Sequence, residues 1–269
     1  AVLTALYSIA PYPRSPCQVV DALLHPSDAP AAPALRPQPV GKEVRATLDG
    51  KAVAFERLVA KVAQRDRAGI RHRVALTDGA EPFQEHMRIS LPEFHLVLDI
   101  IHASEYLWAV ANALLGETHP ERTAWMDKHL LQLLSGQARQ LLRTLQRLAQ
   151  EKGRTPAQRA ALHKAIGYYQ RNLPYMRYDE YLARGWPIAT GVIEGACGHL
   201  VKDRMEQSGM RWTKAGAQSM LDLRAVRLND DWEAYQRFHR QRVHQRLYGS
   251  RPSAPRSLEE RALTRPVHA

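Results

Sequence analysis

The sequence predicts an α/β fold that is interrupted by an all-helical block and followed by further helices. Short apolar segments alternate with helical patterns in the first part of the chain, and two of them end in an acid, Asp78 and Asp99. Leucines then recur at the helical period without any strand-like segment. A short apolar segment and a helix that carries Glu194 follow, and the chain ends in a basic helix and tail. The corresponding segments are 1–116, 117–183, 184–230 and 231–269.

Four strands are predicted before the helical block. Aliphatic and β-branched residues bounded by turn formers place them at 2–10, 42–48, 73–77 and 94–98. Helical periodicity predicts helices over 17–25, 52–66 and 105–115, with a further short helix after the turn at Asp78-Gly79. Five prolines make residues 26–40 an irregular connector.

The helical block is predicted to contain helices over 121–150 and 155–172. Thr155 provides an N-cap for the second helix, and Pro156 occupies its first position. Two more helices are predicted over 214–228 and 231–247, and the last of them has a basic face of arginines and histidines. The Pro- and Arg-rich residues from Gly249 onward are predicted to be loose. Five tyrosines are expected to pack between the helical block and the core: Tyr168, Tyr169, Tyr175, Tyr178 and Tyr181.

The charge balance indicates a partner that carries phosphates. Among 269 residues, 38 Lys and Arg stand against 27 Asp and Glu, which gives a net charge of +11 and a pI near 9.9. This excess is typical of proteins that bind nucleic acid, although GC-rich bacterial genomes also raise the arginine content. The two cysteines, Cys17 and Cys197, are expected to be buried thiols in a reducing compartment. The sequence contains no apolar run of membrane-spanning length, so we expect a cytoplasmic protein.

The stretch from Trp186 to Trp212 is the most informative part of the chain. A strand-like piece after Trp186 turns at Thr190-Gly191 into a helix, for which Thr190 is a plausible N-cap. Glu194 lies in the first turn of this helix, where the helix dipole favours a carboxylate. Glycines at 191, 195 and 198 leave room for a ligand. An ordinary amphipathic helix with a dipole-matched acid is the alternative.

Asp78, Asp99 and Glu194 together indicate metal-assisted phosphoryl transfer. Ligand sites in open α/β sheets lie at the carboxyl ends of strands, where both aspartates are predicted. Carboxylates from separate elements can converge on Mg²⁺ or Mn²⁺, which activate a nucleophile and stabilise the leaving oxygen. Acids at strand ends are also common as turn formers and caps, so their spacing alone is weak evidence.

The segments LTDGAEPFQ, LVLDIIHASEYLW and GVIEGACGHLVKDRMEQSGMRW resemble bacterial insertion-sequence transposases of the ISKra group. The likeness covers almost the whole chain and is most specific around Glu194. The group belongs to the broad DDE class of transposases, which has a ribonuclease-H-like catalytic fold. The resemblance implies such a core, incomplete at its N-terminus, and a helical insertion domain at 117–183.

The resemblance also implies roles for individual residues. Asp78 corresponds to the second acid of the catalytic triad and Glu194 to the final glutamate, and these two are the expected metal ligands. Asp99 and His102 correspond to an Asp-x-x-His element that related transposases carry. His102 is expected either to orient an acid or phosphate, or simply to cap the start of its helix.

The first acid of the triad is missing from the expected place. Such an acid lies on the first strand of the fold, whereas no Asp or Glu precedes Asp21 in this sequence. Asp49 follows the second predicted strand of this sequence, which corresponds to the third strand of such a core. It is therefore a poor substitute for the first acid. The simplest expectation is a fragment that lacks the first strand and an upstream DNA-binding region, and that is catalytically incomplete as it stands.

The expected substrate is DNA, bound by a homodimer or a larger assembly that pairs two transposon ends. Lys202, Arg204 and Arg211 are candidate phosphate contacts, with a solvated basic face as the alternative. Trp212 is a candidate for stacking on a base, with a place in the core as the alternative. Two rival functions stay open, a metal-dependent nuclease of the same fold and a non-catalytic DNA-binding remnant.

Overall fold

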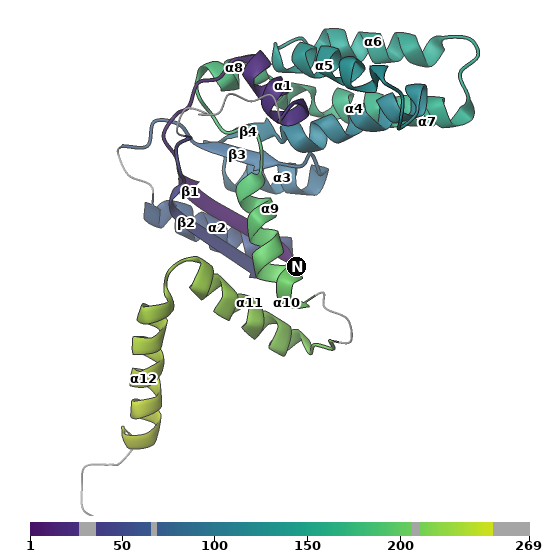
Figure 1. Cartoon of the computed structure of the whole chain (residues 1–269). Coiled ribbons are helices and arrows are strands. Elements are labelled where there is room, and N and C mark those ends of the chain that lie inside the picture. The colour runs from purple at the N-terminus through teal and green to yellow at the C-terminus, as the bar shows by residue number, and fades with distance from the viewer. Residues whose placement is uncertain (27–35, 66–68, 206–209, 250–269) are drawn as a thin grey trace, which may run out of the picture. The chain divides into compact units, whose positions relative to one another are not determined.

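The computed structural model describes residues 1–26, 36–65, 69–205 and 210–249 (Figure 1). Residue contacts divide the chain into two compact units, Ala1–Ala225 and Val226–Ala269. The mixed α/β class predicted from the sequence is confirmed, and most of the described residues are helical. Most of the Pro-rich connector and nearly all of the C-terminal tail lie outside the described residues.

The first two strands form an antiparallel pair. β1 (Val2–Ser8) runs beside β2 (Val40–Thr47), with Val2 opposite Thr47 and Leu6 opposite Glu43. α1 (Pro16–Leu24) lies between them in sequence and begins with a capping box, in which Ser15 and Gln18 exchange side-chain-to-backbone hydrogen bonds. α2 (Lys51–Arg65) follows and packs against β1.

The next two strands form a parallel pair that presents two acids at one edge. β3 (Val74–Thr77) and β4 (His95–Leu98) run side by side, with Thr77 opposite Leu98, and α3 (Glu81–Ser90) connects them. Because parallel strands end at the same edge, Asp78 and Asp99 directly follow neighbouring strand ends. The sequence predicted this arrangement.

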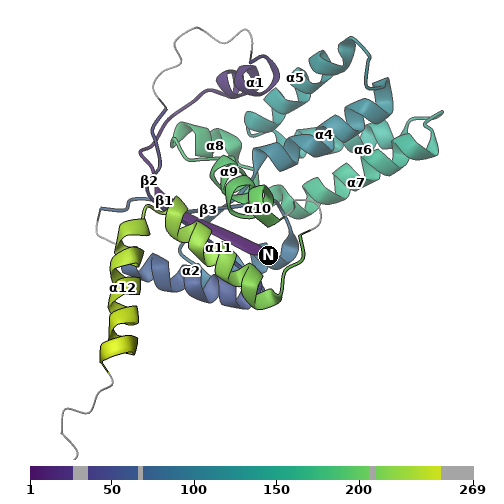
Figure 2. The same cartoon turned by 60° about the horizontal axis from the view of Figure 1, so that its bottom comes forward.

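The two strand pairs do not share a hydrogen-bond ladder within the described part of the chain. Figures 1 and 2 show β1 between β2 and β3, so that β1 and β3 turn their unpaired edges toward each other. β1 is apolar over most of its length but only half-buried, as expected for a strand with one free edge.

The helical block packs on α4 (Ile100–Leu115) and on β4. One apolar core contains Val97 and Leu98, the inner face of α4 and the buried leucines of the block, so these parts bury their apolar faces together. The predicted helix over 121–150 is in fact two helices, because Gly136 adopts a φ of +76° and turns the chain between them. The helices of the block are α5 (Glu121–Leu134), α6 (Ala138–Gln150), α7 (Pro156–Asn172), the 3₁₀ turn η1 (Leu173–Tyr175) and α8 (Tyr178–Ala183).

The predicted packing of the tyrosines is confirmed. Tyr169, Tyr178 and Tyr181 are almost fully buried, and Tyr168 is 4% exposed. Their hydroxyls donate hydrogen bonds to main-chain oxygens of the strand region and of α4. The acceptors are those of Asp78 for Tyr168, Ala103 for Tyr169, Leu98 for Tyr178 and Leu96 for Tyr181.

The helix that carries Glu194 changes its winding along its length. α9 (Gly191–Cys197) continues into a π-helical turn, η2 (Gly198–Lys202), and into α10 (Asp203–Met205). The strand-like piece after Trp186 joins neither of the two sheets in the described part of the chain. Its Ile188 oxygen instead accepts a hydrogen bond from Ile100 N at 2.9 Å. α11 (Lys214–Leu228) and α12 (Trp232–Tyr248) match the last two predicted helices.

One local prediction is wrong, one alternative is excluded, and one prediction holds only in part. Cys17 is exposed rather than buried, because it lies on the outer side of α1. Trp212 is 37% exposed, so it does not belong to the core. Thr190 occupies the N-cap position of α9 but its side chain makes no capping hydrogen bond, since its hydroxyl is engaged elsewhere. Within the described residues, no helix is both long and apolar enough to cross a bilayer.

Candidate metal centre

Asp78 and Asp99 leave neighbouring strands but lie in different environments. The main-chain N–H of Asp99 donates to Thr77 O at 2.8 Å, which extends the β3–β4 pairing up to the acids. Asp78 is exposed, and its Oδ1 accepts a hydrogen bond from Ala80 N at 2.9 Å. Asp99 is completely buried. The exposed acid is therefore open to a ligand from solvent, whereas the buried acid is held inside the protein.

The Asp99 carboxylate joins two segments that are far apart in sequence. Oδ1 caps α4 by accepting hydrogen bonds from Ile101 N at 2.6 Å and His102 N at 3.4 Å. Oδ2 accepts a hydrogen bond from Thr190 N at 2.7 Å and a second one from the Thr190 hydroxyl. Since a buried carboxylate needs such donors, the four hydrogen bonds account for its place in the interior.

Thr190 also connects Asp99 to α9, the helix that carries Glu194. The carbonyl oxygen of Thr190 accepts hydrogen bonds from Ile193 N at 2.7 Å and Glu194 N at 3.0 Å, which form the first turn of α9. The preceding Trp186 is buried and stacks on His95 of β4 with ring centroids 4.8 Å apart. The start of α9 is thereby fixed to the ends of β4 and α4.

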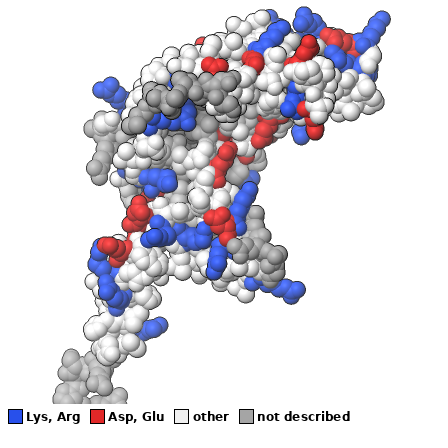
Figure 3. All heavy atoms as spheres, in the orientation of Figure 1, with Lys and Arg blue, Asp and Glu red and all other residues white. Residues whose placement is uncertain are grey.

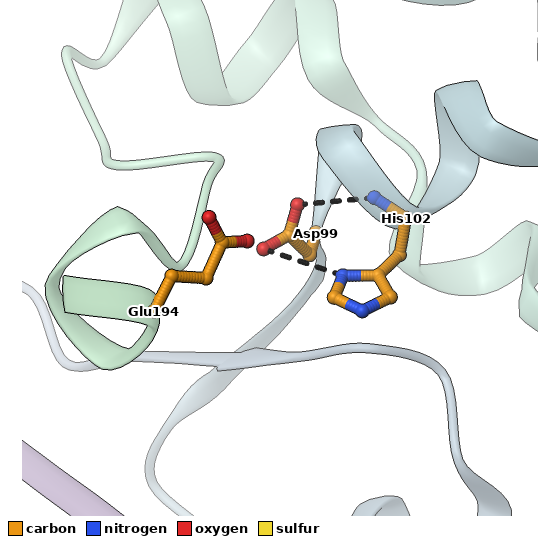
Figure 4. A group of neighbouring side chains, drawn as sticks. All are labelled: Asp99, His102 and Glu194. Carbon is orange, nitrogen blue, oxygen red and sulfur yellow. Dashed lines mark hydrogen bonds and ion pairs between the residues drawn. The ribbon is translucent and has the colours of Figure 1, made fainter. Parts of the chain in front are cut away.

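These contacts assemble a group of three possible metal ligands, Asp99, His102 and Glu194. One ligand atom from each lies within 4.8 Å of the others. Figure 4 shows the Glu194 carboxylate and the His102 ring on opposite sides of Asp99. Asp99 is buried, His102 is half-buried and Glu194 is exposed, so the group connects the interior with the surface. It could hold a metal ion.

His102 provides the observation that most favours a ligand in this group. Its Nδ1 atom is inaccessible to solvent and has no hydrogen-bond partner in the described part of the chain, although it lies 3.8 Å from Asp99 Oδ2. A buried polar atom without a partner is costly, and an ion bound among the three side chains would give it one. No hydrogen bond or ion pair engages the Glu194 carboxylate among the described residues, so it is also free to bind.

Of the three side chains, Asp99 has the fewest free lone pairs for a metal ion. Each of its oxygens already accepts two hydrogen bonds, which matches the two lone pairs of each carboxylate oxygen. Coordination by Oδ2 would therefore require the Thr190 hydroxyl to move away. His102 and Glu194 offer their ligand atoms without such a cost, while Asp99 fixes both elements that carry them.

The structure brings some of the predicted site residues together and leaves the others apart on the surface. Asp78 is outside the three-residue group, while Asp99, His102 and Glu194 come together. No family model, curated protein or solved structure matches the chain. The interpretation of the site thus depends on its own geometry and chemistry.

Two shallow hollows of about 500 and 480 Å³ lie along α5, and none of the predicted site residues lines them.

The candidate DNA contacts lie on the surface beyond Glu194. Lys202 ends the π-helical turn and Arg204 belongs to α10, and both are exposed. Arg211 and Trp212 are exposed in the segment before α11. Figure 3 shows Lys and Arg side chains gathered over the region of α10 and α11. Close after α9, this surface offers cations for phosphates and an accessible aromatic ring.

Glycine leaves the surface of α9 open. A Cβ atom at Gly191, Gly195 or Gly198 would meet no atom of the described residues within 4 Å, apart from the neighbouring backbone of the helix itself. The space predicted beside Glu194 is therefore present, although no packing contact demands glycine at these positions. The π-helical turn that follows is a feature that often accompanies functional sites.

Proposed function

We propose that the chain is the catalytic part of a DNA transposase of a bacterial insertion sequence, similar to the ISKra group of the DDE class. The observation that carries the proposal is the group of Asp99, His102 and Glu194. Asp99 of one resembling segment and Thr190, which directly precedes the segment of Glu194, are 91 positions apart and meet through a buried hydrogen-bonded junction. The meeting of these segments beside a free glutamate is what a metal-dependent site requires.

The reaction is hydrolysis at the transposon ends followed by attack of the freed 3′-hydroxyl on target DNA. Bound divalent ions would activate the attacking oxygen and stabilise the leaving oxygen. Glu194 and His102 would hold an ion, and Asp99 would orient both of them. Asp78, exposed at the neighbouring strand end, would supply a further carboxylate. Lys202 and Arg204 would contact the phosphates of the bound DNA.

The donor set favours Mn²⁺ over Mg²⁺ as the working ion. Mg²⁺ takes oxygen ligands almost exclusively, whereas Mn²⁺ also accepts an imidazole nitrogen beside carboxylates. His102 contributes such a nitrogen, because its Nδ1 has no hydrogen-bond partner among the described residues. We therefore propose Mn²⁺ as the preferred cofactor and Mg²⁺ as a weaker substitute.

The finer fold that we propose is a ribonuclease-H-like core with a helical insertion between Asp78 and Glu194. Such a core has a strand that bears the first acid of the catalytic triad. None of the four described strands carries that acid. The facing edges of β1 and β3 have no ladder partner among the described residues, and we propose that this strand lies between them. The working assembly would be a dimer or larger on DNA, in the bacterial cytoplasm.

Strand transfer by the complete encoded protein tests the proposal. The substrates are labelled duplexes made from the DNA that flanks the coding sequence, with a free 3′-hydroxyl at the end that is distal to the coding sequence. A supercoiled plasmid is the target. We expect Mn²⁺-dependent joining of label to plasmid, and its loss in Glu194→Gln with DNA affinity unchanged. Plasmid cleavage without joining would indicate a nuclease instead. DNA binding without any cleavage, equal in the two proteins, would indicate a DNA-binding remnant.

A further inference from the structure

Among the four tyrosine hydroxyls that bind main-chain oxygens, that of Tyr168 has a special acceptor. It donates to the carbonyl oxygen of Asp78 at 2.9 Å, from a position 90 residues later in the chain. The Tyr181 hydroxyl, in contrast, reaches Leu96 O within β4. The Tyr178 hydroxyl donates to Leu98 O, in the peptide that precedes Asp99. Of these four hydroxyls, that of Tyr168 alone donates to the carbonyl oxygen of a candidate metal-binding acid itself.

The ring of Tyr168 is held on several sides. It stacks on Tyr106 of α4 with centroids 3.8 Å apart and an interplanar angle of 13°, and it meets Tyr169 edge-on. The carbonyl of Tyr168 accepts a hydrogen bond from Asn172 Nδ2 at 2.9 Å. Asn172 Oδ1 in turn accepts one from Gln84 of α3 at 2.6 Å, so α7 is tied to the helix that follows Asp78.

The turn after β3 fits closely against this ring. Gly79 has a φ of +87°, which favours glycine, and a Cβ atom there would lie 2.9 Å from the Tyr168 hydroxyl oxygen. Asp78 Oδ1 bonds Ala80 N within the same turn. The Asp78 side chain is thus tied to the same turn whose carbonyl oxygen accepts the Tyr168 hydroxyl.

The hydroxyl of Tyr168 remains a proton donor over the working range of pH. Burial is the main cause that raises the pKa of Tyr168, and Tyr106, Asp78, Asp99 and Glu105 raise it further. A neutral phenol can donate to the Asp78 carbonyl, whereas a phenolate would repel it. The donor role thus agrees with the electrostatics of the site.

We propose that Tyr168 is a positioning residue that aligns Asp78 for metal binding by fixing the Asp78-Gly79 turn. This inference rests on the proposed function. Through it the helical block, which lies between the two acids in sequence, takes part in building the site. A displacement of a reacting group by about 1 Å can cost roughly 100-fold in rate, so loss of one such contact is expected to matter.

The test compares Tyr168→Phe with Tyr181→Phe in the strand-transfer assay. Both variants lose a hydroxyl that donates to a main-chain oxygen, but Tyr181 touches none of the candidate acids. We expect Tyr168→Phe to lower kcat at saturating Mn²⁺ by roughly 10-fold or more, with the KM for DNA within about 2-fold of the parent. Tyr181→Phe should keep the parent kcat at a similar loss of stability. Equal kcat values for the two variants would overturn the inference.

Two further variants, Tyr106→Leu and Asp78→Asn, distinguish failure of the positioning role from failure of the proposed function. Tyr106→Leu retains the Tyr168 hydroxyl but removes the ring on which it stacks, and we expect kcat to fall in the same direction. If Tyr168→Phe does not fold, Tyr106→Leu tests the positioning role in its place. An unchanged kcat of Tyr106→Leu would contradict the inference. Asp78→Asn must abolish joining. If Asp78→Asn stays active, the role of Asp78 in the proposed function is wrong. If it is inactive while Tyr168→Phe is not, only the positioning role is wrong.

Discussion

Replacement of Thr190 by valine should weaken the junction that places Glu194. The Thr190 hydroxyl donates to Oδ2 of Asp99, which is completely buried. A hydrogen bond to a charged group contributes about 1.5–3 kcal/mol to stability. Valine has nearly the same shape and removes this bond alone, so we expect the free energy of unfolding to fall by about 2 kcal/mol. At about 2–4 °C per kcal/mol, the Tm should fall by roughly 4–8 °C.

Urea unfolding of a matched set of variants measures this effect. Thr190→Ser keeps the hydroxyl and should lie within about 1 kcal/mol of the parent. Asp99→Asn places an amide NH₂ or a weaker acceptor toward Thr190 and should cost more than Thr190→Val. Thr144→Val is the control, because the Thr144 hydroxyl donates to Gln140 O at 3.1 Å within α6. If Thr190→Val costs no more than Thr144→Val, the junction does not have the energetic role that we assign to it.

Three further predictions concern pH, backbone strain and salt. Burial is the main cause that lowers the pKa of His129, with Lys128 adding to it, although the Trp125 carbonyl raises it. The stability from neutral His129 is therefore complete above about pH 6.5 and falls at lower pH, a component that His129→Gln should remove in urea unfolding. Gly79→Ala should cost more than about 2 kcal/mol in the same measurement, because of its positive φ. Arg240→Gln with Arg246→Gln should reduce the slope of log affinity for DNA against log salt by up to about 1.8.

Each of these predictions has a result that would contradict it. An unchanged pH dependence in His129→Gln would show that another group causes it. A Gly79→Ala protein as stable as the parent would mean that the turn relaxes at no cost. For the salt dependence, Arg139→Gln with Arg143→Gln on α6 provides the control, since these arginines are also exposed. An equal change in slope for both pairs would mean that α12 has no special part in DNA binding.

Most elements were predictable from local sequence signals. The capping boxes at Ser15 and Thr155 and the apolar strands that end in Asp78 and Asp99 each contain their structural information within a few residues. The break at Gly136 was missed because leucines keep the helical period across it. The π-helical turn after α9 has no local signal either, since the same residues also suit an α-helix.

The sequence pointed to the members of the candidate site, although it paired Glu194 with Asp78 as the metal ligands, and it did not reveal the connections between them. Asp99, His102 and Glu194 stood out as acids and a histidine at element ends. The Asp99–Thr190 junction could not be predicted, because it joins residues 91 positions apart and threonine was expected to cap its own helix. The same holds for Tyr168, whose hydroxyl is one of many that packing alone could explain. Long-range hydrogen bonds of this kind depend on the complete fold.

Titration of the protein with Mn²⁺ by isothermal calorimetry tests the metal centre most directly. We expect a Mn²⁺ site that Glu194→Gln and His102→Gln both weaken by at least about 10-fold, with weaker binding of Mg²⁺. Glu85→Gln, which changes an exposed acid paired with Arg88, should bind like the parent. If Mn²⁺ does not bind, or if all three variants bind it like the parent, the group of Asp99, His102 and Glu194 is not a metal centre.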